Sequence, residues 1–232
     1  MPVVWLAGLA AICPMAGAAD QATDHDRQSM RRTPVVEIFE TWQDSVVFVT
    51  GPVVSSGPPP LDEFFDLPTK KRETSVGGGF VVHPSGYILT NAHATAKVID
   101  HKVILSNSKS YPAELVAQVP EDDLALLKID VGRPLHAVRL APADDLLVGE
   151  TVVAIGHPHG LRFTCTAGVL SASGRSTKLL DMKGLRLQNL IQCDAGINPG
   201  SSGGPWLNIL GEVIGITVSM KRNAENIAFA VP

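Results

Sequence analysis

The stretch Asn198–Pro205 reads N-P-G-S-S-G-G-P and constrains this chain of 232 residues more than any other segment. Ser202 stands two residues after Gly200 and directly before two further glycines. A tight glycine turn exposes a serine hydroxyl for nucleophilic attack, and the backbone N–H groups of Gly200, Ser201 and Ser202 can converge on a developing oxyanion. The alternative is a plain Gly/Ser loop between two strands. Other residues of the chain have to decide between these two interpretations.

Two upstream segments supply the partners that a nucleophilic serine needs. His93 closes the run L-T-N-A-H (89–93), and Asp123 opens the alternating segment D-L-A-L-L-K-I (123–129). Histidine, aspartate and serine in this chain order match the chymotrypsin-like arrangement rather than that of subtilisins or α/β-hydrolases. The pattern predicts that Ser202 attacks a carbonyl, that His93 moves the proton, and that Asp123 orients the imidazole.

Three neighbouring residues compete for these roles. Glu121 and Asp122 are alternatives to Asp123, but only Asp123 directly opens the L-A-L strand. Ser201 is an alternative to Ser202, but only Ser202 directly precedes the two glycines. The sequence therefore favours His93, Asp123 and Ser202.

The chain resembles the HtrA (Deg) family of trypsin-fold serine proteases from about Pro34 to its end. The resemblance is carried by S-V-G-G-G-F-V-V (75–82), G-Y-I-L-T-N-A-H (86–93), D-D-L-A-L-L-K-I (122–129), G-V-L-S-A-S-G-R (168–175), I-Q-C-D-A-G-I-N-P-G-S-S-G-G-P (191–205), G-E-V-I-G-I (211–216) and A-F-A-V-P (228–232). It implies an all-β fold of two six-stranded antiparallel β-barrels with a short N-terminal helix. It also implies proteolysis of unfolded or damaged extracytoplasmic proteins.

Composition agrees with a small β-rich protein. With 45% hydrophobic residues, the chain can form one compact unit or two small barrels. Its 21 glycines and 17 prolines suit many short strands and turns. The net charge of −4 without a basic stripe argues against nucleic acid as a partner. Three cysteines do not form a disulfide framework, and we expect Cys165 and Cys193 to be buried thiols.

Local patterns divide the chain into a protease domain over 34–232, with barrel one at about 34–140, a linker at 141–149 and barrel two at about 150–232. Thr33 and Pro34 predict a helix over Val35–Trp42. Alternating and apolar segments predict strands. These are expected at 45–50, 78–83, 87–90, 102–105, 113–118, 124–129, 151–155, 163–171, 187–193, 212–220 and 227–231.

The N-terminal residues have the pattern of a targeting segment rather than of a part of the folded domain. Residues 1–19 hold a short apolar core followed by Ala16-Gly17-Ala18, which predicts a signal peptide cut near Ala18 and no stable membrane span. The alternative is a wrongly assigned start or a disordered apolar tail. Residues 20–33 are polar and predict a flexible segment. The destination is then periplasmic or secreted.

Two surface features have open interpretations. The Pro-rich stretch 51–74 predicts a long loop, and its Phe64 and Phe65 contact either another subunit or their own barrel. Family members form trimers through N-terminal aromatic residues, so Phe39 or Trp42 either serves a homotrimer or packs on its own barrel. His157-Pro158-His159 lacks a third ligand, so we expect a turn, no metal and no cofactor.

The specificity pocket follows from counting back from the nucleophile. In trypsin-fold enzymes that cut after Lys or Arg, an acidic residue lies six positions before the serine; here that position is the uncharged Gly196. Ile197 and the segment Ile216-Thr217-Val218 are the expected remaining walls of the S1 pocket. Such walls favour cleavage after Val, Ala, Ile or Leu, because a buried ammonium would be left unpaired.

Two departures from the family pattern affect the functional hypothesis. Ser201 stands where the family usually has Asn and digestive relatives have Asp, so activation by an inserted N-terminal amine is not expected. Family members typically continue beyond F-A-V-P into PDZ domains, whereas the sequence contains none up to Pro232. The chain is then either a member without PDZ domains or a fragment of a longer protein. The leading hypothesis is an active serine endopeptidase; the alternative is a catalytically silent binding or chaperone module with the same fold.

Overall fold

The computed structural model describes residues 24–53, 74–96, 98–142, 144–157, 163–178, 186–220 and 226–232. The predicted signal peptide, Phe64 and Phe65 lie outside these ranges. The chain divides into two units, residues 1–33 and Pro34–Pro232. In the first unit, helix α1 spans Asp24–Met30 inside the segment predicted to be flexible, and its residues from Asp26 to Met30 are exposed. The sequence patterns had not indicated this helix.

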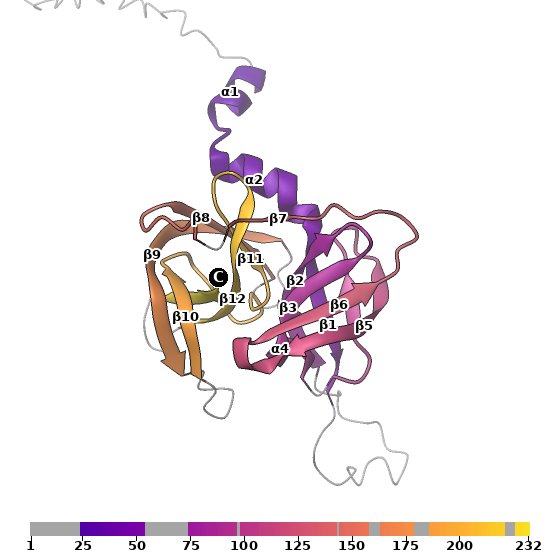
Figure 1. Cartoon of the computed structure of the whole chain (residues 1–232). Coiled ribbons are helices and arrows are strands. Elements are labelled where there is room, and N and C mark those ends of the chain that lie inside the picture. Colours follow the sequence, from indigo (N-terminus) through magenta and orange to yellow (C-terminus); the bar gives the residue numbers. More distant parts are fainter. Residues whose placement is uncertain are drawn as a thin grey trace, which may run out of the picture. The chain divides into compact units, whose positions relative to one another are not determined.

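The first half of the second unit is a closed six-stranded antiparallel barrel, with strand order β1-β2-β3-β6-β5-β4 (Figure 1). Sequential hairpins build most of it, as the short strands and Gly/Pro-rich turns predicted. Its strands are β1 (Val46–Pro52), β2 (Thr74–His83), β3 (Tyr87–Asn91), β4 (Lys102–Ile104), β5 (Ser110–Val119) and β6 (Leu124–Ile129).

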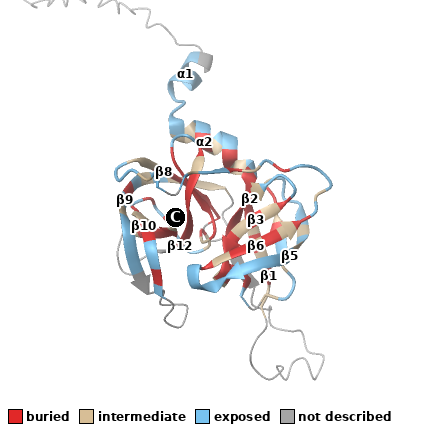
Figure 2. Cartoon of the chain, viewed as in Figure 1, coloured by how far each residue is buried: buried red, intermediate tan, exposed pale blue. Residues whose placement is uncertain are grey.

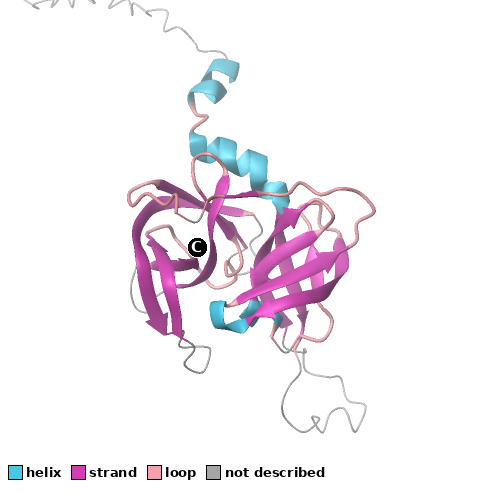
Figure 3. Ribbon diagram, in the orientation of Figure 1, coloured by secondary structure: helices cyan, strands magenta, loops and turns pink. Residues whose placement is uncertain are grey.

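The second half is a seven-stranded sheet, in the order β11-β8-β9-β10-β13-β12-β7. An additional pairing of β11 with β12 brings the sheet round into a near-barrel (Figure 3). Its strands are β7 (Arg139–Leu140), β8 (Thr151–Gly156), β9 (Thr164–Lys178), β10 (Arg186–Cys193), β11 (Pro205–Leu207), β12 (Glu212–Met220) and β13 (Ala228–Val231).

The predicted fold class is confirmed, and two strands, β7 and β11, add to those that the sequence predicted. Strand β7 lies at the end of the range predicted for barrel one, yet it pairs in parallel with β12 of the second sheet. Arg139 donates a side-chain hydrogen bond to the Leu210 carbonyl at 3.2 Å, and the Ala141 N–H donates to the Val213 carbonyl at 2.9 Å. These bonds fix the crossing segment on the second sheet before the predicted linker begins.

Helix α2 (Pro34–Trp42) confirms the predicted N-terminal helix and packs its apolar face on the domain. Ile38 and Trp42 are buried, and the Trp42 indole stacks on the His136 ring with centroids 4.6 Å apart. Phe39 is half-buried against the same cluster. Both aromatic residues thus pack on their own domain, as one of the two expectations had it, and a homotrimer stays a prediction. The short helices are η1 (Gln43–Ser45), α4 (Ala92–Thr95) and η2 (Pro120–Asp122).

Alternation along single strands supplies two cores at once. In β1, Val47 points into barrel one while Val46 joins a cluster between the barrels; in β2, Val81 and Phe80 divide in the same way. Since successive side chains of a strand point to opposite faces, each of these strands serves both cores. The resulting shared core contains Ile38, Trp42, Val46, Phe80, Val138, Val153, Ile155, Leu207, Val213 and Ile216. Figure 2 shows in red where buried residues lie along the strands of both halves.

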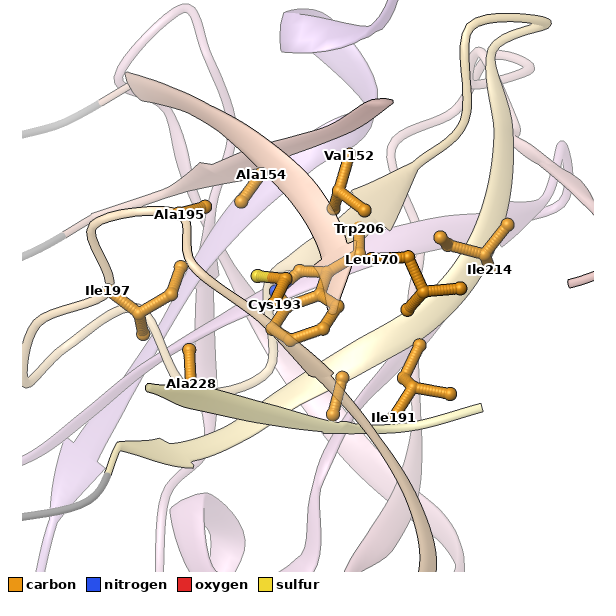
Figure 4. Packing of buried hydrophobic residues seen from close by; sticks show 11 residues of the cluster. Val152, Ala154, Leu170, Ile191, Cys193, Ala195, Ile197, Trp206, Ile214 and Ala228 are labelled. Atoms are coloured by element: carbon orange, nitrogen blue, oxygen red, sulfur yellow. The ribbon is translucent and has the colours of Figure 1, made fainter. Parts of the chain in front are cut away.

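The second sheet closes over its own apolar core around Trp206. Figure 4 shows the Trp206 indole surrounded by side chains from several strands, including Leu170, Ile191 and Cys193. These four residues are at most 1% exposed. The density of such a core makes it sensitive to the removal of single methylene groups.

Leu170 and Val169 offer a matched test of this packing, because they are neighbours on β9 with opposite orientations. Leu170 is fully buried, whereas Val169 is 41% exposed. We expect Leu170→Ala to lower the free energy of unfolding by about 2–5 kcal/mol, through lost burial and a residual cavity. Val169→Ala should change it by less than about 0.5–1 kcal/mol. Equal effects in urea unfolding would contradict the assigned register.

Candidate active site

His93 and Asp123 meet because β3 and β6 are paired. In that ladder Asn91 lies opposite Leu124, so the residue after β3 faces the residue before β6. The Ala92 N–H accordingly donates to the Asp123 carbonyl at 3.1 Å. Helix α4 begins at Ala92 and places His93 directly over the aspartate. Residues 30 positions apart in the chain are thereby joined by ordinary strand pairing.

His93 contacts the Asp123 carboxylate through two short hydrogen bonds, one involving its ring and one its backbone. The His93 Nδ1 lies 2.7 Å from Asp123 Oδ2, and the His93 backbone N–H donates to Asp123 Oδ1 at 2.9 Å. The Asp123 side chain is fully buried, while that of His93 is 29% exposed. A buried carboxylate needs hydrogen-bonded partners, and His93 supplies both of these. The imidazole is held at Nδ1 and remains accessible to solvent.

The backbone of Asp123 has an uncommon conformation that its neighbours support. Its φ of 55° and ψ of 39° lie in the left-handed region, which non-glycine residues visit rarely and Asp more readily than most. The buried Asn91 side-chain amide donates to the Asp123 carbonyl at 3.1 Å, beside the bond from Ala92. The competing acids Glu121 and Asp122 are exposed in η2. The structure thus joins His93 to Asp123, as the sequence predicted.

The loop that carries Ser202 begins with a type II turn over Asn198–Ser201. Pro199 occupies its second position, Gly200 its third with φ +97°, and the Ser201 N–H closes it by donating to the Asn198 carbonyl at 3.0 Å. A type II turn requires positive φ at its third residue, which glycine adopts without steric cost. The glycine predicted to shape this loop is therefore the residue that the turn geometry demands.

The same turn corrects one assignment made from the sequence. Ser201 was among the three expected oxyanion donors, but its N–H is already bonded to Asn198 inside the turn. For the N–H groups of Gly200 and Ser202, the structure shows no acceptor among the residues it describes. Ser201 is buried at 6% exposure and contributes to the loop's geometry instead.

Ser202 lies against barrel one next to the histidine segment. A Cβ built on Gly77 would meet both the Ala94 Cβ, at 3.0 Å, and the Ser202 carbonyl oxygen, at 3.4 Å. The residue after His93 and the backbone of Ser202 thus border the same glycine. The Ser202 hydroxyl makes a long hydrogen bond to the Val218 carbonyl at 3.4 Å. Within the described ranges it makes none to His93, a separation that unliganded sites often show before substrate binds.

The five residues expected to form the S1 pocket do not share one environment. Gly196, Ile197 and Thr217 line a narrow cavity beside Ser201, with space for a water-sized group of about 10 Å³. Ile216 belongs to the core between the barrels and borders a separate apolar pocket of about 170 Å³. Val218 packs with Leu187, Leu190 and Phe229. Only its carbonyl, facing Ser202, reaches the site.

The histidine pair considered for metal binding is only partly described. His157 is buried, and its Nδ1 accepts a hydrogen bond from the Phe163 N–H at 3.2 Å; Pro158 and His159 lie outside the described ranges. Over the described ranges there is no group of three His, Cys, Asp or Glu residues suited to hold a metal ion.

The helices in those ranges are all too short or too polar to span a bilayer.

The two cysteines of the protease domain are free, as expected; Cys193 is buried, whereas Cys165, also expected to be buried, is half-buried. Burial raises the pKa of the Cys193 thiol to about 12; the neighbouring Asp194 carboxylate adds to the rise, and a hydrogen bond with the Ala195 backbone opposes it. Burial also raises the pKa of Cys165. A thiol kept in its protonated form is a poor nucleophile, so neither cysteine competes with Ser202.

The model of the "Trypsin-like peptidase domain" family matches residues 77–216, which is more than half of the chain and includes His93, Asp123 and Ser202. The chain belongs to the trypsin-like serine peptidases of the HtrA type. The His93–Asp123 hydrogen bond and the turn before Ser202 both lie inside the matched segment.

Individual relatives agree with this placement. The chain is 38% identical over 180 residues to a probable periplasmic serine endoprotease DegP-like of Chlamydia pneumoniae, covering 74% of this chain and 36% of that protein. It is 36% identical over 242 residues to a protein of the same description from Hahella chejuensis, covering 99% and 50%. The chain thus spans half or less of these curated relatives.

Solved structures show the same relationship in three dimensions. The HtrA-type protease AlgW with a tripeptide has a TM-score of 0.71 and 31% identity, covering 85% of this chain and 59% of that chain. The serine endoprotease from Yersinia pestis has a TM-score of 0.68 and 30% identity, covering 87% and 63%. The fold and the family assignment therefore agree.

The sequence had not indicated three contributors to the site: Asn91, Thr90 and the Val218 carbonyl. One signal was present in the glycine run V-G-G-G-F (76–80), since glycines inside a strand often mark a close approach of another backbone. Here that backbone is the loop around Ser202.

Proposed function

We propose that this chain is an active serine endopeptidase that cleaves unfolded or damaged polypeptides by an acyl-enzyme mechanism. The observation that carries the proposal is the pair of solvent-accessible His93 and buried Asp123, with Nδ1 and Oδ2 2.7 Å apart, near the turn that carries the half-buried Ser202. Nucleophile, base and orienting acid in this arrangement are the requirement for acyl transfer. The names of the HtrA-type relatives support the same reaction.

In the proposed reaction Ser202 attacks the scissile carbonyl and His93 Nε2 accepts the hydroxyl proton. His93 then delivers that proton to the leaving amine, and a water molecule repeats the sequence to release the acyl group. Asp123 holds the N–H at Nδ1, which fixes the tautomer and leaves Nε2 as the base. The first step requires the Ser202 hydroxyl to rotate from the Val218 carbonyl toward His93.

The oxyanion is assigned to the N–H groups of Gly200 and Ser202, without Ser201. Types I and II of the turn differ by rotation of the central peptide, which here joins Pro199 to Gly200. Glycine at position 200 permits both orientations. One orientation directs the Gly200 N–H to the substrate oxygen, so the turn type determines whether the oxyanion hole is complete; one such donor contributes roughly 10²–10³ in turnover.

A catalytically silent binding module is the competing function, and one observation favours it. The Ser202 hydroxyl is bonded to Val218 rather than to His93 in this structure. If that orientation persisted with substrate bound, His93 could not activate the serine. Labelling with a fluorophosphonate separates the two functions, because the reagent reports serine activation without any assumption about substrate.

We expect fluorophosphonate to label the wild-type protein at Ser202, and Ser202→Ala to abolish the labelling. Ser202→Ala, His93→Ala and Asp123→Ala should each lower cleavage of casein by orders of magnitude, and a double variant should be little worse than either single one, because the residues act as one unit. Glu121→Ala is the matched control, since Glu121 is an exposed acid near Asp123, and should retain wild-type activity. A fully active Ser202→Ala protein would reject the proposal.

The substrate pocket is proposed to accept small uncharged side chains. The cavity beside Ser201 is lined by Gly196, Ile197, Thr217, Thr164 and Thr166 among others, and none of its lining residues is charged. A Cβ built on Gly196 would have only the Thr166 methyl within reach, at 3.9 Å, so that position is open. An unpaired ammonium in such a site is disfavoured by several kcal/mol.

The uncharged lining favours cleavage after Val, Ala, Ile or Leu, with loose discrimination of about 10–200-fold between side chains that differ by one methylene. At about 10 Å³ the cavity is smaller than any of these side chains except Ala, so it has to widen when substrate binds. Cut sites on a denatured protein, mapped by mass spectrometry, test this. Gly196→Asp introduces a carboxylate into the open position and should move the preference toward Lys and Arg. A wild-type preference for Lys, Arg or Phe would reject the assignment of the pocket.

The proposed site of action is extracytoplasmic, in the periplasm or after secretion. It is supported by the apolar leader at 1–19 and by the word "periplasmic" in the names of two relatives. We expect the protein to be recovered in the osmotic-shock fraction with a mature N-terminus near Ala18–Ala19. Cytoplasmic recovery of the uncut chain would reject this location.

A further inference from the structure

A chain of two buried hydrogen bonds crosses from barrel one to Ser202. The Gly78 N–H donates to the Ser202 carbonyl at 2.6 Å. The Gly78 carbonyl in turn accepts the Thr90 hydroxyl at 2.7 Å. Gly78 lies on β2 and Thr90 on β3, three residues before His93. One glycine is thereby bonded on one side to the serine's backbone and on the other to the strand that leads to the histidine.

The two backbones meet here without intervening side chains. A Cβ built on Gly78 would lie 3.0 Å from the Gly204 nitrogen and 3.3 Å from the Ser202 carbonyl oxygen. A Cβ on Gly203, whose φ is +85°, would strike the Gly78 carbonyl and lie 2.8 Å from the Thr90 hydroxyl oxygen. Glycines at both positions allow this approach. The gap between β2 and the Ser202 loop is therefore set by hydrogen bonds rather than by side-chain packing.

Thr90 contributes its side chain to this crossing. It is fully buried, and its backbone pairs with Ala125 two residues after Asp123. A buried hydroxyl needs a partner, and the Gly78 carbonyl supplies it. Through this bond the β3–β6 ladder, which positions His93 and Asp123, is tied to the segment that holds Ser202.

We propose that Thr90 is a positioning residue that sets the register between the His93–Asp123 pair and the Ser202 hydroxyl. It contacts neither substrate nor reacting atoms and acts through Gly78. The inference rests on the proposed peptidase function, because its effect on rate presupposes Ser202 as the nucleophile. The Ser202 hydroxyl must turn from Val218 to His93, and a small displacement of its backbone changes whether Nε2 lies within reach.

The test compares Thr90→Val, which removes the hydroxyl and keeps the branched shape, with Thr90→Ser, which keeps the hydroxyl. For Thr90→Val we expect kcat on a peptide and the rate of fluorophosphonate labelling to fall about 10–100-fold, as a misplaced nucleophile predicts. KM should remain within about 2-fold, and the midpoint of the pH–rate profile should not move, since His93 is untouched. Thr90→Ser should restore the rates to within about 3-fold of the wild type.

A second readout does not depend on activity. The Gly78 amide should exchange with deuterium at least about tenfold faster in Thr90→Val than in the wild type, and at the wild-type rate in Thr90→Ser, because local opening controls amide exchange. Val103→Ala is the control for general destabilisation. Val103 is fully buried in the apolar core inside barrel one, and this core does not include Gly78, Thr90 or Ser202. It should leave labelling of the folded protein unchanged.

Each result has a definite meaning. Thr90→Val with wild-type labelling and kcat, or with unchanged Gly78 exchange, would overturn the positioning role. A loss of rate that Val103→Ala reproduces at equal stability would also overturn it, because a general structural effect would then suffice. Absence of labelling in the wild type would reject the peptidase function alone, and Gly78 exchange would still decide whether Thr90 controls the crossing.

Discussion

The apolar core shared by the two barrels is the constraint on which the site depends. His93 and Asp123 belong to one barrel and Ser202 to the other, so their meeting requires that Val46 and Phe80 pack against Val153 and Ile155. In β2 and β8, alternate residues face this interface, namely Phe80 and Val82, and Val153 and Ile155; β1 contributes Val46. A change of register by one residue in any of these strands would exchange the two cores and separate the site.

Polar contacts then refine what the core brings together. The left-handed conformation of Asp123 is held by donors from Ala92 and Asn91, and its carboxylate receives both of its hydrogen bonds from His93. These groups are buried, so an unmade bond would leave a desolvated acceptor. The Gly78–Ser202 bond plays the corresponding part on the serine side. Apolar packing sets the approximate geometry, and this buried network determines the orientations.

The sequence predicted the local features and missed those created by contacts between segments that are distant in the chain. Alternation identified nearly every strand, and the Gly-rich context of Ser202 identified the turn, because both signals are contained within a few residues. The strands β7 and β11 were missed because two or three residues carry no periodicity. Ile216 and Val218 lie outside the cavity that Thr217 lines, because alternation along β12 points both of them to the opposite face, where they join apolar clusters. Ser201 failed as a donor since turn closure uses its N–H.

Division of the site between two barrels has a consequence for biogenesis. A folding intermediate with only barrel one formed contains the His93–Asp123 pair, joined locally by β3 and β6, and lacks the serine. An intermediate with only the second sheet formed contains Ser202 without its base. If the chain is the peptidase proposed above, proteolytic activity arises only when both halves have folded and docked. A partly folded chain therefore cannot cleave other newly synthesised, unfolded chains of the same protein.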